Sequence, residues 1–402
     1  MTLSNPATAQ LPAPLHSHRL EWKEGADTLQ ALWLTERQVS APKAVLLGDD
    51  TLNADVALRA IMAGTVILYR GDFHNGRQLV QALARRLDRK KGSRKAKSPE
   101  LTPAHAFHLH RQSQAQRARV LNAVLVPLNA DFSVPLRRAP EVREAVGQAW
   151  GDVRWPGLAC VSVRELQGLI GAHEWRKKGV EIPALGPTDN RVFPFYGVYS
   201  PVRGEYLDLI AQAQLPDALL KPGGVAADVG TGTGVIAAVL ARRGVFRVLA
   251  TETDPRAVAC AEQNIGQLGL KSTVQVQQRD LWPDEPVDLL VCNPPWLPAK
   301  PTSPIERAIY DDNSAMLGAF LKGARQHLKP EGRVWLVMSD LAVHLGLRKP
   351  GELEQLFSQT GWVVEDQLTI KPQHSKTLDT QDPLHVARRQ EITSLWCLQP
   401  AG

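Results

Sequence analysis

The stretch VAADVGTGTGVIAAVLARRG, residues 225–244, decides the fold of this chain. It begins with an apolar segment typical of a buried strand, continues with three alternating glycines, and ends as an Ala- and Leu-rich helix that Gly244 terminates. Glycines are needed between the two elements because a Cβ would block the turn and keep a ligand away from the backbone. The stretch therefore predicts a strand, a binding loop and a helix of a parallel α/β sheet.

The glycine spacing and the next acidic residue indicate which ligand the loop takes. A dinucleotide-binding loop would have its third glycine one place later, where this chain has Val235, which argues against a nicotinamide cofactor. The next apolar run ends at Glu252, 22 residues after Gly230. At the carboxyl edge of a neighbouring parallel strand, this carboxylate can accept hydrogen bonds from both hydroxyls of a ribose. The alternative is an exposed glutamate beside the helix cap Asp254.

A third strand is predicted by TVQVQQRDLW, residues 273–282, and ends near Asp280. The Asp280 carboxylate could accept a hydrogen bond from an adenine amino group, with Leu281 and Trp282 against the ring. The alternative is that Asp280 only caps the end of the strand.

A fourth apolar run, VDLLVC, is followed by NPPW, residues 293–296. The order DVGTGTG, acidic strand end, RDLW and NPPW resembles the class I S-adenosylmethionine-dependent methyltransferases, especially the amino-methylating branch with an Asn/Asp-Pro-Pro-aromatic motif. The resemblance covers about residues 186–402. That branch includes glutamine methyltransferases of release factors and ribosomal protein, guanine and adenine methyltransferases of ribosomal and transfer RNA, and DNA adenine methyltransferases. Trp in place of Tyr or Phe departs from the release-factor enzymes and indicates a bulkier or differently placed target.

The resemblance implies S-adenosyl-L-methionine as the cofactor and no metal. The catalytic residues that it implies are Asn293, Pro294, Pro295 and Trp296. The cofactor-binding residues are Asp228, Gly230, Thr231, Gly232, Thr233, Gly234, Glu252, Asp280 and Leu281. Tyr199 and Arg203, in VYSPVRGEY, stand where related enzymes place a loop over the cofactor; the alternative is that they pack the domain junction.

The residue types of NPPW suit transfer to a planar nitrogen, whose delocalised lone pair makes it a weak nucleophile. The side-chain oxygen of Asn293 and the main-chain carbonyl of Pro294 can accept from its hydrogens and orient it toward the methyl group. Pro294 and Pro295 fix φ and stiffen the backbone that carries these acceptors. Trp296 offers a flat face for stacking, worth about 1 to 3 kcal/mol when the target is a base. The alternative reading of Asn-Pro-Pro is a plain loop breaker.

The fold class predicted is α/β: a C-terminal seven-stranded Rossmann-like methyltransferase domain with a terminal antiparallel hairpin, preceded by an N-terminal α/β accessory domain. A Pro/Gly-rich connector, residues 183–210, sets the boundary near Leu185. The domains are thus a disordered tail over residues 1–19, a basic accessory, substrate-recognition domain over residues 20–185 and the methyltransferase domain over residues 186–402. A long segment inside the hairpin, residues 374–390, is expected to be a mobile flap.

Charge divides the chain in two. Residues 1–200 carry 27 Lys and Arg against 18 Asp and Glu, whereas the rest carries 20 against 23. The basic run RRLDRKKGSRKAK, residues 85–97, is either a phosphate-contacting patch or a solvated helix end. HAFHLH, residues 105–110, lacks a carboxylate or cysteine at ligand spacing, so we expect no metal there.

Composition excludes several classes of protein. No apolar run approaches the roughly 20 residues that span a bilayer, so no membrane partner is expected. The N-terminus lacks the features of a secretory signal. Four scattered cysteines, with no pairing or metal-ligand spacing, suit a reduced cytoplasm and are expected to be buried fillers.

The leading hypothesis is an N-methyltransferase that moves a methyl group from S-adenosylmethionine to a planar amino or amide nitrogen, with an exocyclic base amine of RNA as the first acceptor. A glutamine of a translation factor or ribosomal protein is the second acceptor, and a DNA adenine, which would have to be flipped out of a duplex, is the third. Small-molecule acceptors stay open. A hypothesis of another class is a non-catalytic scaffold that binds S-adenosylmethionine. Oligomeric state is not readable from the sequence.

Overall fold

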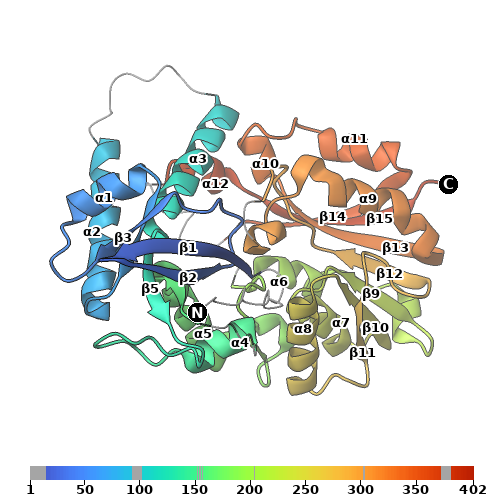
Figure 1. The fold of residues 1–402 in the computed structure, drawn as a ribbon. Coiled ribbons are helices and arrows are strands. Elements are labelled where there is room, and N and C mark those ends of the chain that lie inside the picture. Colours follow the sequence, from blue (N-terminus) through green and yellow to red (C-terminus); the bar gives the residue numbers. More distant parts are fainter. Residues whose placement is uncertain are drawn as a thin grey trace. The chain divides into compact units, whose positions relative to one another are not determined.

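The computed structural model of the 402-residue chain describes residues 15–92, 102–151, 153, 155, 157–202, 204–301, 304–372 and 382–402. The described residues form two compact units (Figure 1). One holds those within 1–101, 108–174 and 302–304, and the other holds those within 102–107, 175–301 and 305–402.

The second unit is built on a seven-stranded sheet in the order β11-β10-β9-β12-β13-β15-β14. The strands are β9 (Val225–Val229), β10 (Arg247–Glu252), β11 (Val274–Gln278), β12 (Val287–Cys292), β13 (Leu328–Ser339), β14 (Trp362–Ile370) and β15 (Thr393–Pro400). The first five in chain order pair in parallel, whereas β15 runs antiparallel to both β13 and β14. The predicted seven-stranded sheet with a terminal antiparallel hairpin is confirmed.

Helices cover both faces of this sheet, α7 and α8 on one face and α9 and α11 on the other (Figure 1). The unit's helices are α6 (Glu205–Gln212), α7 (Val235–Arg242), α8 (Pro255–Gln267), α9 (Ala315–Gly323), α10 (Leu341–His344), α11 (Glu352–Gln359) and α12 (His385–Gln390), with 3-10 turns η1 (Pro183–Leu185), η2 (Asp217–Leu220), η3 (Pro304–Ala308), η4 (Asp312–Ser314) and η5 (Ala324–His327). Ala226 of β9 packs in the α7 core, while Ala227 packs in the α9 core. The sheet therefore buries both faces, as parallel sheets require.

The division between the units lies upstream of the predicted boundary near Leu185. A short hairpin, β7 (Val180–Glu181) and β8 (Arg191–Val192), follows helix α5. Val180, Ile182 and Leu185 are buried in the same core as α7, which assigns them to the second unit. The substrate-recognition role given to the residues before this boundary stays a prediction.

The first unit has a six-stranded mixed sheet in the order β1-β2-β6-β5-β4-β3. Its elements are β1 (His16–Glu24), β2 (Asp27–Thr35), β3 (Ala44–Gly48), α1 (Ala54–Met62), β4 (Thr65–Tyr69), α2 (Phe73–Gly92), α3 (Pro103–Leu121), β5 (Val124–Leu128), α4 (Arg143–Trp150), β6 (Ala159–Ser162) and α5 (Val163–Lys178), of which α3 and α5 each extend into the second unit. The predicted N-terminal α/β architecture is confirmed. Strand β1 begins at His16, inside the tail predicted over residues 1–19, because it pairs along its whole length with β2.

The hairpin segment predicted as a flap is partly helical. Residues 373–381 of it lie outside the described residues. Residues Leu384 and Ala387, at and within α12, are buried against Leu341 and Ala342 of α10. This end of the segment is therefore packed into the second unit.

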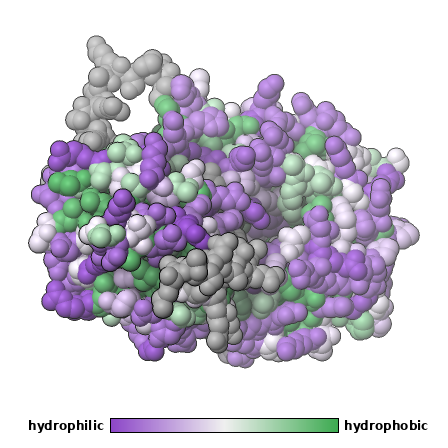
Figure 2. All heavy atoms as spheres, viewed as in Figure 1, coloured by the Kyte–Doolittle hydropathy of each residue, from purple (hydrophilic) through white to green (hydrophobic). Residues whose placement is uncertain are grey.

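The burial of the cysteines and the hydropathy of the surface follow the expectations from composition. All four cysteines are free and buried, and the predicted burial is confirmed. On the face drawn in Figure 2, hydrophilic residues dominate the coloured surface and hydrophobic ones occur in small separate groups. In the part of the chain that the structure describes, no helix is long and apolar enough to cross a membrane.

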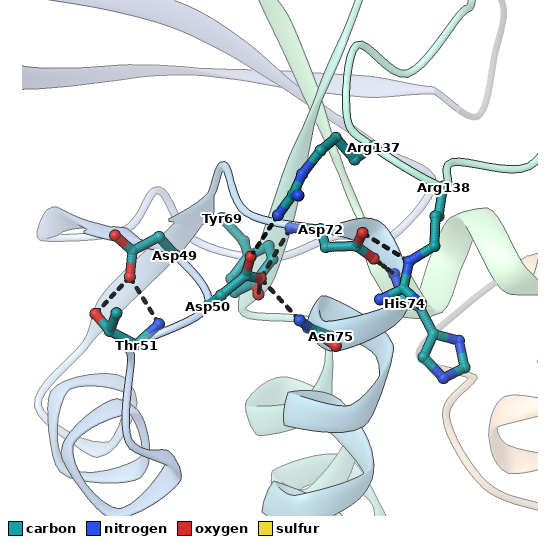
Figure 3. Close-up of polar contacts among 9 residues, drawn as sticks. All are labelled: Asp49, Asp50, Thr51, Tyr69, Asp72, His74, Asn75, Arg137 and Arg138. Atoms are coloured by element: carbon teal, nitrogen blue, oxygen red, sulfur yellow. Dashed lines mark hydrogen bonds and ion pairs between the residues drawn. The ribbon is translucent and has the colours of Figure 1, made fainter.

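One carboxylate ties together the loops at the carboxyl ends of β3 and β4 (Figure 3). Asp50 accepts hydrogen bonds from the hydroxyl of Tyr69 at 2.7 Å, from the backbone N–H of Asp72 at 2.9 Å and from Asn75 at 3.1 Å. Arg137 approaches its second oxygen at 3.1 Å. These hydrogen bonds, that from Tyr69 first, lower the pKa of Asp50 to about 2. The network is fully paired and joins loops far apart in sequence.

We expect Asp50→Asn to lower the midpoint of thermal unfolding of the first unit at pH 7 by several degrees. An ordinary Asp has a pKa of about 3.9, so the folded state favours the ionised carboxyl and the stabilisation is present above about pH 4. It is lost as the pH falls toward 2, so the difference between wild type and variant should narrow there. Circular dichroism melts across this range, with the exposed Asp27→Asn as control, measure it; a difference independent of pH would contradict the account.

Candidate active site

Four strand ends meet at one edge of the second sheet. In the parallel register, Val229 of β9 lies beside Thr251 of β10 on one side and beside Cys292 of β12 on the other. Glu252 in turn lies beside Gln278 of β11. The glycine loop after β9, the acidic end of β10 and the NPPW segment after β12 therefore leave the sheet side by side, in the crevice region where open α/β sheets bind ligands.

The glycine loop has the backbone conformation that its residues predict. Gly230, Gly232 and Gly234 all have positive φ, at 74°, 56° and 81°. A Cβ on Gly232 would meet no atom within 4 Å, so open space lies in front of the loop. A Cβ on Gly234 would come within 3.3 Å of Ala261, which shows that this glycine serves the close packing of α7 on α8. Thr231 and Thr233 beside them are buried.

Asp228 is the buried charge beneath the loop. One of its oxygens accepts from the hydroxyl of Thr231 at 2.5 Å and from the backbone N–H of Ala237 at 3.0 Å. The other oxygen, Oδ1, is buried and has no hydrogen-bond partner among the described residues. Burial raises the pKa of this carboxyl to about 7, against the effect of the two hydrogen bonds. An unpaired buried carboxylate oxygen fits a cationic or hydrogen-donating ligand.

Glu252 is held by the backbone around it. Its Oε2 accepts from the N–H of Gly232 at 3.1 Å, and its Oε1 accepts from the N–H groups of Thr253 at 2.8 Å and Asp254 at 3.2 Å. Oε1 also accepts from the hydroxyl of Thr253 at 3.4 Å. Oε2 accepts only from Gly232 among the described residues, so one of its two lone pairs remains for a ligand. The arrangement accommodates one ribose hydroxyl directly, whereas two would require one of these hydrogen bonds to yield.

At the end of the third strand, β11, the position of Trp282 differs from the prediction. Asp280 is exposed, and Leu281 is half-buried with a positive φ of 58°, its carbonyl accepting from the hydroxyl of Thr251 at 2.8 Å. Trp282, expected against an adenine ring, instead stacks on His327 and Phe320, with ring centroids 4.5 and 5.6 Å away. A large indole gains more from burial in the α9 core than from exposure at the edge.

The NPPW segment follows β12 directly and folds back on itself. The indole N–H of Trp296 donates to the side-chain oxygen of Asn293 at 2.9 Å. Pro294 is buried, whereas Asn293, Pro295 and Trp296 are half-buried. Trp296 also packs against the core clusters of both sheet faces, so only part of its ring remains for stacking on a guest.

Tyr206 is a site residue that the sequence interpretation missed. It lies in the first turn of α6, is only 6% exposed, and the Asn293 side chain is close enough to act on the pKa of its hydroxyl. Tyr199, predicted in a cofactor loop, is half-buried and close enough to Tyr206 to interact with it electrostatically. Arg203 lies outside the described residues. A tyrosine on the apolar face of a helix has the pattern of a core residue, so the sequence did not distinguish Tyr206 from its core neighbours.

Asp311 fixes the loop beyond NPPW and was likewise missed. Its two carboxylate oxygens accept from the backbone N–H groups of Met316 and Leu317, each at 3.0 Å, and so cap α9. A bridge between Leu297 and Tyr310 joins the two ends of this loop. The loop that carries NPPW is thus fastened to the helix layer.

The remaining predictions concern the first half of the chain. Of the basic run 85–97, residues 93–97 and the side chains from Arg89 onward lie outside what the structure describes. Arg86 pairs with Asp55 at 2.6 Å. Among the described residues no three His, Cys, Asp or Glu side chains gather as a metal site requires.

Comparison with known proteins agrees with this geometry. Residues 196–368 match the family model of the methyltransferase small domain. The release factor glutamine methyltransferase of Cereibacter sphaeroides is 33% identical over 133 residues, which are 30% of this chain and 48% of that protein. The tRNA1(Val) (adenine(37)-N6)-methyltransferase of Parabacteroides distasonis is 36% identical over 119 residues, 28% of this chain and 50% of that protein.

A third relative, the ribosomal protein L11 methyltransferase of Pelotomaculum thermopropionicum, is 40% identical over 82 residues, 20% of this chain and 27% of that protein. The chain thus spans half or less of the length of these curated relatives. The residues that match the family model contain the glycine loop, the acidic strand end and NPPW. Residues 196–368 therefore match the methyltransferase small domain, which agrees with the resemblance to the amino-methylating, S-adenosylmethionine-dependent class.

Proposed function

We propose that the protein is an N-methyltransferase that transfers a methyl group from S-adenosylmethionine to a planar amino or amide nitrogen, and that the acceptor is an exocyclic base amine of RNA. The observation that carries the proposal is the parallel register that sets Cys292, and with it NPPW, directly beside the glycine loop after Val229. A donor site and an amine-orienting group at one sheet edge serve group transfer, whereas a binding scaffold has no need of the second.

The residues at the edge suit the cofactor. When bound, S-adenosylmethionine supplies a methyl group already activated by its positive sulfonium. The open space before Gly232 admits a ligand against the backbone, and the unpaired oxygen of Asp228 suits a cationic ligand. The remaining acceptor position of Glu252 suits a ribose hydroxyl. We assign Asp280 and Leu281 to the adenine side of the same site.

Asn293 and the Pro294 carbonyl act on the acceptor. The Asn293 oxygen has two lone pairs and gives one to Trp296, so the other can accept from an amino hydrogen. Two fixed acceptors orient the nitrogen and need no reorganisation when charge develops on it. The proton can leave to solvent after attack, so no general base is required.

RNA is favoured over protein by the positive charge of the first 200 residues, which suits a polyanion. A relative named as an adenine methyltransferase of tRNA supports the same choice. The second acceptor class is a protein glutamine on a translation factor or ribosomal protein, supported by the relative named for release factors. In either case the residues before the methyltransferase domain would recognise the acceptor, and the free cysteines suit a cytoplasmic enzyme.

The acceptor is tested by labelling. Lysate of a strain that lacks the gene is incubated with the purified full chain and radiolabelled S-adenosylmethionine, and the product is divided between nuclease and protease digestion. Label released by nuclease supports RNA, and label released by protease moves the acceptor to protein. If the wild-type chain labels neither fraction, the proposed activity is wrong.

Asn293→Ala and Glu252→Ala should have opposite effects. Asn293 is proposed to touch only the acceptor, so we expect at least a 100-fold loss of methyl transfer with affinity for S-adenosylhomocysteine within a few-fold. Glu252 is proposed to hold the cofactor, so its loss should weaken that affinity first. Calorimetric titration and initial rates separate the two; loss of cofactor affinity in Asn293→Ala would show that Asn293 is misassigned. Titration of the wild type with NADH is the control, and a preference for NADH would overturn the cofactor.

Affinity for the cofactor should also depend on pH through Asp228. Its pKa near 7 in the free protein means that the carboxyl is largely neutral below pH 6 and ionised above pH 8. A cationic ligand prefers the ionised form, so binding of S-adenosylmethionine should tighten from pH 6 to 8 and lower this pKa. Asp228→Asn should bind more weakly and lose this dependence in calorimetry. A wild-type affinity that is flat over this range would contradict the role.

A further inference from the structure

The side-chain amide of Asn293 has a neighbour at each of its ends. Its oxygen accepts the indole N–H of Trp296 at 2.9 Å. The amide also acts on the hydroxyl of Tyr206 and favours a lower pKa there, as a nearby NH2 donor does. The two partners come from different parts of the fold, because Tyr206 lies on α6 and Trp296 lies three residues beyond the amide. Neither contact follows from a loop-breaking role for the prolines.

The two contacts fix which end of the amide faces which way. An indole nitrogen can only donate, so it must face the amide oxygen, whereas a hydroxyl can accept from the NH2 group. A flipped amide would set its NH2 against the indole N–H and lose the pairing of both donors. Phe at position 296 would lack the donor altogether, and the phenol of a Tyr carries its only donor at the far end of the ring.

Tyr206 is suited to this task and unsuited to proton transfer. Burial raises the pKa of its hydroxyl well above the usual value, with Tyr199 and Asp228 acting in the same direction and the hydrogen bond from Asn293 against it. The hydroxyl therefore stays neutral throughout the physiological range and can serve Asn293 only as a fixed hydrogen-bonding partner. Its ring is packed in the core with Leu207 and Ile210, which holds the hydroxyl in place.

We propose that Tyr206 and the indole N–H of Trp296 are positioning residues, which together orient the Asn293 amide so that its oxygen faces the acceptor nitrogen. This inference rests on the proposed function and deepens it: Trp296 acts through its N–H group as well as through its ring face. The second lone pair of the Asn293 oxygen is then the position that the acceptor amine takes. Loss of either partner frees the amide to rotate, and misplacement of an acceptor by about 1 Å can cost about 100-fold in rate.

The test is Trp296→Phe, which keeps a flat aromatic ring and removes the donor. The labelled fraction of the lysate experiment, RNA or protein, serves as acceptor, and kcat, KM and the affinity for S-adenosylhomocysteine are measured with the full chain. We expect kcat to fall about 10- to 100-fold, with KM for the acceptor and the cofactor affinity each within about threefold. Tyr206→Phe, which keeps the ring and removes the hydroxyl, should show the same pattern.

Trp362→Phe is the matched control. It also removes an indole hydrogen bond, from Nε1 to the carbonyl of Leu321 at 2.8 Å, but in the α9 core and in no contact with Asn293. It should lower the thermal midpoint and leave kcat within about twofold. If Tyr206→Phe fails to fold, the half-exposed Trp296→Phe decides alone.

The outcomes separate this inference from the function beneath it. If the wild type is active and Trp296→Phe keeps its kcat while its KM for the acceptor rises, Trp296 serves only as a stacking face. The inference would then be wrong. A loss of kcat no larger than that of Trp362→Phe would overturn it as well. A wild type that labels no fraction would instead overturn the proposed function.

Discussion

The parallel pairing of β9 with β10 and β12 is the constraint on which the site depends. Parallel strands end at the same edge, so one register brings the glycine loop, the Glu252 carboxylate and the Asn293 amide into a row. A shift of one residue would turn the core side chains of a strand toward the opposite face. Because both faces of this sheet are buried, the apolar packing that stabilises the fold also fixes the site.

Polar groups at this edge are partly or fully buried, and burial of a polar group without a hydrogen-bond partner costs free energy. Glu252 is held by three backbone N–H groups and the Asn293 oxygen by the indole N–H of Trp296, whereas Asp228 retains one buried oxygen without a partner among the described residues. Fully paired groups are rigid, and the unpaired one fits a ligand that brings its own donor or positive charge. The edge thus combines preorganised hydrogen-bond acceptors with one buried carboxylate oxygen that has no hydrogen-bond partner among the described residues.

Sequence patterns predicted the sheet and the positive φ angles of the glycine loop, because hydrophobic period and glycine placement report local backbone geometry directly. The patterns failed where an apolar side chain could either contact a ligand or pack in the core. Trp282 was expected against a ligand and lies instead in the α9 core, stacked on His327. Tyr206 has the pattern of a core residue, and its interaction with Asn293 joins positions far apart in the chain. Local patterns carry no information on such long-range contacts. The upstream division of the units escaped prediction for the same reason, because Val180 and Ile182 belong to a core whose other members follow much later.

The measurement that tests the account most directly is a crystal structure of the full chain with S-adenosylhomocysteine. The account predicts the adenosine along the glycine loop with a ribose hydroxyl on Glu252, the sulfur facing Asn293, and the Asn293 oxygen still bonded to the indole of Trp296. A ligand that binds elsewhere, or one separated from Asn293 by the protein chain with no room for an amine between them, would contradict it.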